Sequence, residues 1–208
     1  MGKIDRLIYT FWTGNNEMSS DRKNALLGLV KNSHCPVLLI TPDNLHKYTN
    51  FPIHESFQYL SETHKADYLR THFMHFHGGG YSDIKNTTGS WLECFTDLEE
   101  SDKWMCGYPE LEGHGGDNWR KLIGNCSYIS KKLTPLSHEW YSSMIKVLDS
   151  KLDVLKKHPA SFPQDTKDQS NYPLAWEEIL GDIFHKVCSN HLERLVNTLP
   201  ISIFENYR

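Results

Sequence analysis

Two short motifs near the middle of the chain have the residue types and the spacing that chemistry would need. Asp67 and Arg70 are three positions apart, so on a helix the carboxylate and the guanidinium would be neighbours. Glycines follow at 78–80, and Asp83 comes shortly after them. These residues suit a nucleoside diphosphate bound with a divalent metal. Asp67 and Arg70 would form a polar clamp, the glycines would let a ligand approach the backbone closely, and Asp83 would offer a carboxylate oxygen to a hard cation.

An ordinary surface ion pair is the alternative interpretation of Asp67 and Arg70. It is the commoner meaning of an Asp-x-x-Arg spacing, and such pairs contribute little free energy. The residues that follow Arg70 favour a ligand-binding site over a surface ion pair, because the predicted helix ends at the glycines and Asp83 comes shortly after them.

The first part of the chain predicts alternating strands and helices. Apolar, β-rich runs at 7–12 and 37–40 indicate buried strands, and the serines at 19–20 offer N-caps for a helix between them. The next helix should run from Ser61 to about His77 and lead into a short strand. Strands and helices in this order predict an α/β fold, with a mostly parallel central sheet flanked by helices.

The second half of the chain continues the alternation. Its predicted elements are a helix at 91–98, strands at 103–108 and 126–130, a long helix at 136–155, a polar loop at 159–173 and a final helix at 174–188. No linker divides the sequence, so residues 1–208 are expected to form a single domain.

Composition excludes several classes of partner. The formal net charge is -4 and no block of Lys and Arg stands out, so nucleic acid is not an expected partner. No apolar run reaches membrane-spanning length, and the N-terminus lacks the apolar core of a signal peptide. The 5 cysteines are widely spaced without a Cys-x-x-Cys pair, which favours reduced thiols and a cytoplasmic location.

The two central motifs resemble the signature of GT-A type nucleotide-sugar glycosyltransferases. In the family with the DXD sugar-binding motif, which includes capsular-polysaccharide transferases and yeast-type α-mannosyltransferases, the pattern is Ser/Ala-Asp-x-x-Arg and then Gly-Gly-x-Tyr-x-Asp-x-Asp. Residues 66–70 and 78–83 are similar to it. The opening run at 8–14 and the late run at 172–185 also resemble segments of that family. The whole resembles the compact glycosyltransferase module of chlorovirus enzymes that decorate capsid glycans.

The resemblance implies a Rossmann-like GT-A fold and transfer of a hexose from a UDP-sugar, with UDP-glucose and UDP-L-rhamnose as candidate donors. The implied acceptor is an oligosaccharide or a glycoprotein glycan. The viral members imply capsid-glycan synthesis in the host cytoplasm, by a module that is the N-terminal part of a longer polypeptide. The implied donor-binding residues are Phe11, Trp12, Thr13, Asp67, Arg70, Gly79, Tyr81, Ser82 and Lys85.

One position departs from the family pattern, because Lys85 replaces the second aspartate of the motif. The resemblance implies a Mn²⁺ or Mg²⁺ ion that bridges the donor diphosphate. Either Asp83 holds this metal with phosphates, water and a distant ligand, for which His185 is the candidate, or Lys85 itself neutralises part of the phosphate charge. We prefer the first alternative, since carboxylate and phosphate oxygens suit these hard cations.

Catalysis is expected to involve a carboxylate near the anomeric carbon or the acceptor hydroxyl. Asp168, in the predicted loop, and Glu178, in the last predicted helix, are the candidates.

Two other functions are compatible with the sequence. A metal-dependent phosphohydrolase could use Asp83 with His72, His75 and His77, although such sites usually gather several carboxylates. A non-catalytic module that binds a sugar or nucleotide would agree with the 6 tryptophans and 10 tyrosines.

Overall fold

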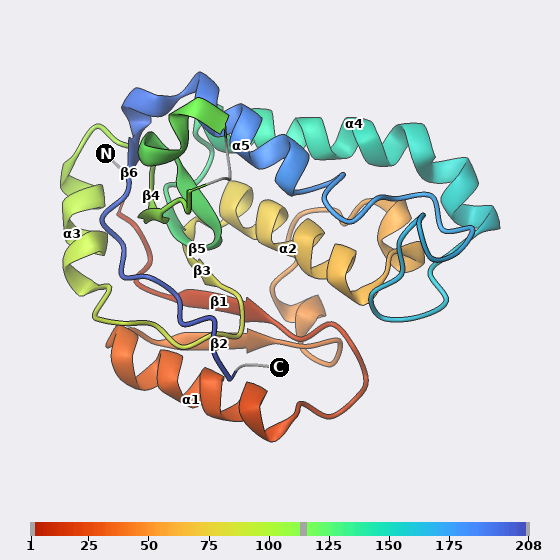
Figure 1. Cartoon of the computed structure of the whole chain (residues 1–208), viewed down its shortest axis with the longest axis horizontal. Coiled ribbons are helices and arrows are strands. Elements are labelled where there is room, and N and C mark those ends of the chain that lie inside the picture. Colours follow the sequence, from red (N-terminus) through yellow and green to blue (C-terminus); the bar gives the residue numbers. More distant parts are fainter. Residues whose placement is uncertain (1–2, 113–115, 207–208) are drawn as a thin grey trace.

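The computed structural model describes residues 3–112 and 116–206, and in this part of the chain six strands form one sheet (Figure 1). The strand order is β2-β1-β3-β5-β4-β6. The strands are β1 (Ile8–Phe11), β2 (Val37–Ile40), β3 (Gly79–Ser82), β4 (Met105–Pro109), β5 (Ile123–Ser130) and β6 (Leu195–Val196). Only β5 of these described strands is antiparallel to its neighbours, so the predicted α/β fold with a mostly parallel sheet is confirmed.

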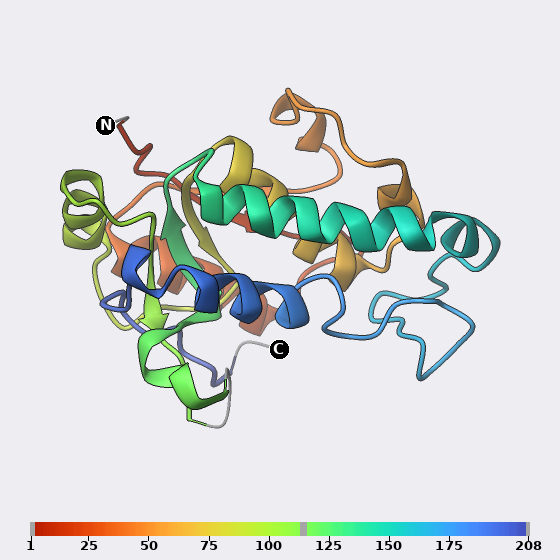
Figure 2. The same ribbon diagram turned by 90° about the horizontal axis from the view of Figure 1, so that it is seen from above.

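Helices cover both faces of the sheet (Figures 1 and 2). They are α1 (Ser20–Ser33), α2 (Glu62–Phe76), α3 (Leu92–Glu100), α4 (Pro135–Lys157) and α5 (Gly181–Asn190), with 3₁₀ turns at Leu45–Lys47, Glu55–Tyr59, Gly116–Lys121 and Leu192–Arg194. None of the helices in the described residues is both long enough and apolar enough to cross a bilayer.

Alternating side chains of β1 enter two different apolar clusters. Ile8 packs in one cluster with Leu29 of α1 and Phe95 of α3. Tyr9 packs in the other, where its ring centroid lies 5.0 Å from that of Phe73 in α2. A strand that is buried on both faces reads as a continuous apolar run, which is why the sequence predicts β1 so clearly.

The glycines between α2 and β3 are required by the backbone. Gly78 and Gly79 have φ values of +68° and +86°, which residues other than glycine rarely adopt. A Cβ on Gly79 would also lie 3.0 Å from the carbonyl oxygen of Leu7 in the neighbouring segment. These residues turn the chain from α2 directly into the sheet, so that Asp83 follows the carboxyl end of β3.

The prediction of a final helix at 174–188 is wrong in its first half. Helix α5 begins only at Gly181, and the residues before it form turns. The carboxylate of Glu178 accepts a hydrogen bond from the backbone N–H of Ala175 (2.9 Å), which offers that segment an alternative to helical bonding. The 2-residue strand β6 was not predicted, because it is too short to show a periodicity.

Candidate functional site

A cleft of about 770 Å³ opens beyond the carboxyl ends of β1 and β3. Ligands of open parallel sheets bind at this edge, where neighbouring strands present their last residues together. Eight residues of the predicted site line the cleft, namely Phe11, Trp12, Thr13, Asp67, Arg70, Tyr81, Asp83 and Lys85. The structure therefore brings together both central motifs and the end of the first strand.

Arg70 lies at the centre of a buried ion-pair network. Its Nη2 atom is 3.1 Å from Oδ1 of Asp67 and 3.1 Å from Oδ1 of Asp83. Its Nη1 atom donates a hydrogen bond to the carbonyl oxygen of Asn125 in β5 (2.8 Å), and the guanidinium carbon is 4.6 Å from the centre of the Tyr81 ring. Arg70 is only 7% exposed, so the pair with Asp67 is not an ordinary surface ion pair.

Both oxygens of Asp83 have partners. Oδ1 accepts a hydrogen bond from the Tyr81 hydroxyl (2.6 Å) in addition to its contact with Arg70, and Oδ2 pairs with the ammonium group of Lys85. Burial alone would raise the pKa of Asp83. The positive charges of Arg70 and Lys85, together with the hydrogen bonds from Lys85 and Tyr81, outweigh burial and hold the pKa well below its usual range. Asp83 is therefore a carboxylate at any physiological pH.

Asp67 behaves differently although it contacts the same guanidinium. Burial raises the pKa of Asp67 to about 7, while the charge of Arg70 lowers it and that of Asp83 raises it further. Asp67 therefore changes its protonation state near neutral pH, and Arg70 keeps its charge throughout.

The end of the first strand also contributes to the lining of the cleft. Phe11 is buried against Tyr81, with ring centroids 5.7 Å apart. The indole N–H of Trp12 donates a hydrogen bond to the backbone carbonyl oxygen of Asn16 (2.7 Å). The hydroxyl of Thr13 donates to the backbone carbonyl oxygen of Glu62 (2.7 Å). Because hydrogen bonds hold Trp12 on the lining of the cleft, its ring is available for stacking.

Gly79 and Ser82 were predicted to bind the ligand, but the structure places neither of them on the cleft lining. Ser82 is buried and its hydroxyl donates to the carbonyl oxygen of Asp83 (2.7 Å). Gly79 is at the amino end of β3, whereas the cleft is at the carboxyl end. Their roles in the described structure are to shape the strand that presents Asp83.

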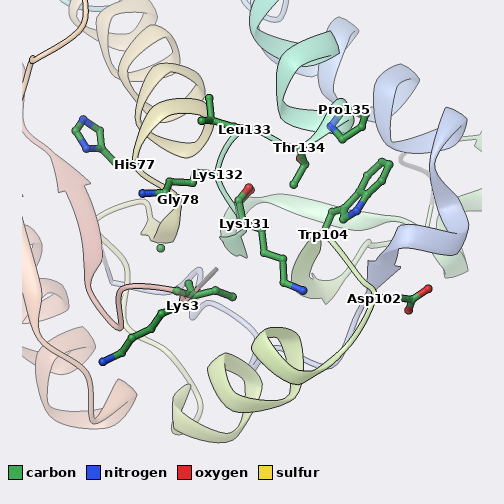
Figure 3. A pocket seen from close by; sticks show the side chains of 13 residues that line it. Lys3, His77, Gly78, Asp102, Trp104, Lys131, Lys132, Leu133, Thr134 and Pro135 are labelled. Atoms are coloured by element: carbon green, nitrogen blue, oxygen red, sulfur yellow. The ribbon is translucent and has the colours of Figure 1, made fainter. Parts of the chain in front are cut away.

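Gly79 lines a second, smaller hollow of about 430 Å³ at the opposite end of β3 (Figure 3). Lys131 lies there, but its ammonium group donates to the carbonyl oxygen of Ser101 (2.7 Å). Asp102 also lines the hollow and pairs with Arg194 at 2.7 Å. Lys131 and Asp102 are thus both engaged by other residues of the fold.

His185, the predicted distant metal ligand, does not reach Asp83. It lies on α5, where its Nε2 atom is 2.6 Å from Oε2 of Glu110, and neither residue lines the cleft. No group of three His, Cys, Asp or Glu side chains within the described residues could hold a metal ion. With both oxygens of Asp83 engaged by Arg70, Tyr81 and Lys85, the residues present do not fit the Mn²⁺ or Mg²⁺ site that the resemblance implied.

The histidine cluster of α2 is part of the core. His72 is buried and packs against Phe76, with ring centroids 4.7 Å apart. His75 lies 3.1 Å from the hydroxyl of Ser137, and His77 follows the end of α2. None of the three lines the cleft in the described structure, so the cluster is separate from Asp83.

The predicted catalytic carboxylates also lie away from the cleft. Asp168 is exposed and Glu178 pairs with Lys151 at 3.0 Å. The adjacent Glu177 lines the cleft instead, and no ion pair or side-chain hydrogen bond to a described residue engages its carboxylate. A catalytic role for Asp168 or Glu178 stays a prediction, and of these three acids only Glu177 lines the cleft.

The structure adds lining residues that sequence reasoning missed. They are supplied by α1, β5 and the turn before α5, and include Arg22, Asn125, Cys126 and Trp176. Arg22 donates from Nη1 to the carbonyl oxygen of Ile84 (3.3 Å), which places a further cation beside Asp83 and Lys85. No local motif marks Arg22, Asn125 or Cys126, whereas Trp176 lies within the run at 172–185 that resembles a family segment.

Comparison with known proteins supports the fold assignment. No protein-family model and no curated protein sequence matches the chain. Among solved structures, the chain is similar to the PaToxG glycosyltransferase, with a TM-score of 0.52 and 13% sequence identity over 91% of this chain and 70% of that one. The protein therefore has the mixed α/β architecture of a glycosyltransferase fold, with a six-stranded sheet in the described residues.

Proposed function

We propose that the protein is a glycosyltransferase that transfers a hexose from a UDP-sugar to a glycan acceptor. The observation that supports this most directly is the buried network of Asp67, Arg70 and Asp83 at the carboxyl edge of the sheet. Its residues are those of the motifs that resemble nucleotide-sugar transferases, and the similar solved structure is also a glycosyltransferase. UDP-glucose and UDP-L-rhamnose are the donors to test first.

The cleft has the size and lining that such a donor needs. Its volume of about 770 Å³ is typical of sites for small molecules and cofactors. The aromatic end of β1, with Phe11 and Trp12, is suited to a nucleobase, and the cationic groups at the end of β3 are suited to a diphosphate.

The transfer step requires a bond exchange at the anomeric carbon of the hexose. The bond from this carbon to the diphosphate oxygen breaks, and the electron pair leaves on UDP. The acceptor oxygen bonds to the carbon, and its proton passes to a carboxylate. We assign that carboxylate to Glu177, because it lines the cleft and its side chain has no partner among the described residues.

The biological setting rests on the sequence. An oligosaccharide or glycoprotein-glycan acceptor, viral capsid-glycan synthesis and an N-terminal module of a longer polypeptide are proposals from the resemblance. A cytoplasmic location and a single domain are proposals from the widely spaced cysteines and from the lack of a dividing linker.

A non-catalytic sugar-binding module is the second candidate. It is favoured by Trp176, which lines the cleft and is 48% exposed, because exposed indole rings bind sugars well. Incubation of the protein with UDP-glucose or UDP-L-rhamnose and a glycan mixture decides between the two. Release of UDP that depends on the acceptor supports the transferase, whereas donor or glycan binding without any UDP release supports the module.

A further inference from the structure

The environment of Asp83 is that of a carboxylate paired with cationic side chains. Arg70 and the Tyr81 hydroxyl contact Oδ1, and the ammonium group of Lys85 contacts Oδ2. A divalent cation bound here would have to displace Lys85 or lie beside two positive charges. Because the side chain of Asp83 is only 19% exposed, solvent and salt would screen this repulsion weakly.

The other carboxylates near this position do not complete a metal site, since no group of three His, Cys, Asp or Glu side chains among the described residues could hold a metal ion. Oδ1 of Asp67 contacts the same Nη2 atom of Arg70 as Oδ1 of Asp83, so this guanidinium already bridges the two acids. Glu62, on the cleft lining, pairs with Lys65 at 2.9 Å. Glu110 pairs with His185 outside the cleft. Asp67, Glu62 and Glu110 each contact a basic side chain in the described structure, and for Asp67 this is the Arg70 that Asp83 also contacts.

Three cationic side chains converge on the end of β3 from three different elements. Arg70 comes from α2, Arg22 from α1, and Lys85 follows the strand itself. All three line the cleft, and Arg22 donates to the carbonyl oxygen of Ile84, between Asp83 and Lys85. Guanidinium and ammonium groups are the usual protein partners of phosphate oxygens.

We propose that Lys85 replaces the metal ion as the cation that binds the diphosphate of the donor, together with Arg70 and Arg22. Donor binding then requires no divalent cation. Asp83 is then a positioning residue that orients Lys85 and Arg70 toward the cleft. This inference rests on the proposed function, because it assumes that the ligand is a nucleoside diphosphate.

The test is calorimetric titration of the full chain with UDP, first in EDTA and then with excess Mn²⁺ or Mg²⁺. We expect UDP to bind in EDTA with a Kd within about threefold of the value with either metal. Binding that is at least tenfold tighter with Mn²⁺ would overturn the metal-free inference and leave the proposed function standing. If UDP and UDP-sugars fail to bind in all of these buffers, the proposed function fails and the inference fails with it.

Variants of Lys85 test the assignment to this residue. Lys85→Gln should weaken UDP binding in EDTA at least tenfold while changing the affinity for uridine, which has no phosphate, less than twofold. Lys85→Arg should keep most of the affinity for UDP. Lys31→Gln on the exposed side of α1 is the matched control and should bind UDP as the wild type does. An unchanged Kd for UDP in Lys85→Gln would overturn the assignment.

Lys85 is only 5% exposed, so its removal could disturb the fold. Thermal unfolding of each variant checks this, and Arg22→Gln supplies an independent measurement. It should also weaken binding of UDP in EDTA and leave binding of uridine unchanged. Equal losses for UDP and uridine in both variants would show that these residues maintain the cleft and do not bind phosphate.

Lys85→Asp gives a reciprocal test, since it restores the second acid of the family motif. This variant should lose affinity for UDP in EDTA and regain it with Mn²⁺. A Lys85→Asp variant that binds UDP in EDTA as tightly as the wild type would contradict the proposal.

Discussion

Nη2 of Arg70, in the middle of α2, lies 3.1 Å from Oδ1 of Asp83, just beyond the end of β3. This contact joins two motifs that are separate in the sequence, and it fixes the helix to the edge of the sheet at the cleft. Arg70 bridges the two acids of the site, because the same nitrogen is also 3.1 Å from Asp67. The structural role and the proposed ligand-binding role of Arg70 therefore cannot be separated by position, only by measurement.

Arg70→Ala should lower the free energy of unfolding by about 3–5 kcal/mol, because it leaves buried charge without its partner. Urea unfolding followed by circular dichroism measures this loss. The matched control is Arg6→Ala, since the Arg6 side chain is 45% exposed and 3.9 Å from Glu99. This control should cost less than about 1 kcal/mol. Similar losses in the two variants would show that the network around Arg70 is no stronger than a surface pair.

Asp67 should make the protein less stable as the pH rises toward neutrality. The ordinary pKa of its side chain is 3.8 and the pKa in the folded protein is about 7, so between these values the folded state holds a proton that the unfolded chain releases. The free energy of unfolding attributable to Asp67 therefore falls as the pH rises from about 4 to about 7. In Asp67→Asn this decrease should be absent.

Urea unfolding of the wild type and of Asp67→Asn at several pH values across this window measures the effect. Asp168→Asn, a change of the same chemistry at an exposed position, is the control and should follow the wild type. Parallel pH profiles for the wild type and Asp67→Asn would mean that Asp67 is ionised across the whole window.

Glu177→Gln should reduce turnover at least 100-fold, which is the typical contribution of a general base. The Kd for UDP should stay within about twofold of the wild-type value, because the cationic groups at the end of β3 are unchanged. Initial rates of acceptor-dependent UDP release, together with calorimetric titration, separate the two effects.

The neighbouring acids provide the comparison for Glu177. Glu178→Gln loses an ion pair with Lys151, so it should affect stability more than turnover. Asp168→Asn is expected to leave both unchanged, since the residue is exposed and outside the cleft lining. A large loss of turnover in Asp168→Asn or Glu178→Gln, with Glu177→Gln fully active, would return the catalytic role to the residues predicted from sequence.

His72→Phe should make the protein more resistant to acid. Burial, with smaller contributions from His77 and His75, lowers the pKa of His72 from 6.5 to about 4. Its contribution to stability is therefore present above pH 6.5 and is lost as the pH falls toward 4. Neither ring nitrogen has a hydrogen-bond partner among the described residues, so phenylalanine removes a buried polar group at no loss of bonding.

The measurement is the midpoint of urea unfolding at about pH 5 and about pH 7.5, on either side of the unfolded-state pKa. The difference between the two midpoints should shrink in His72→Phe. His34→Asn, at an exposed position where the backbone has a positive φ, serves as the control and should keep the wild-type difference. An unaltered difference in His72→Phe would mean that other groups cause the acid sensitivity.

The sequence by itself determined the features that depend on near neighbours. Apolar runs located β1 and β2, and Ser61 and the glycines at 78–80 bounded α2. The spacing of Asp67 and Arg70 predicted their contact, since residues three apart share a helix face. The rule that ligands bind at the carboxyl edge of parallel strands predicted the place of the cleft.

Only the tertiary structure decided which distant residues share the site. Asn125 and Cys126 reach the cleft because β5 pairs with β3, and Glu177 faces it because the segment before α5 turns where a helix was expected. Such contacts depend on packing free energy summed over the whole core, which no local spacing records. The raised pKa of Asp67 and the pairing of Asp83 with Lys85 have the same origin, since burial and long-range charge contacts exist only in the folded chain.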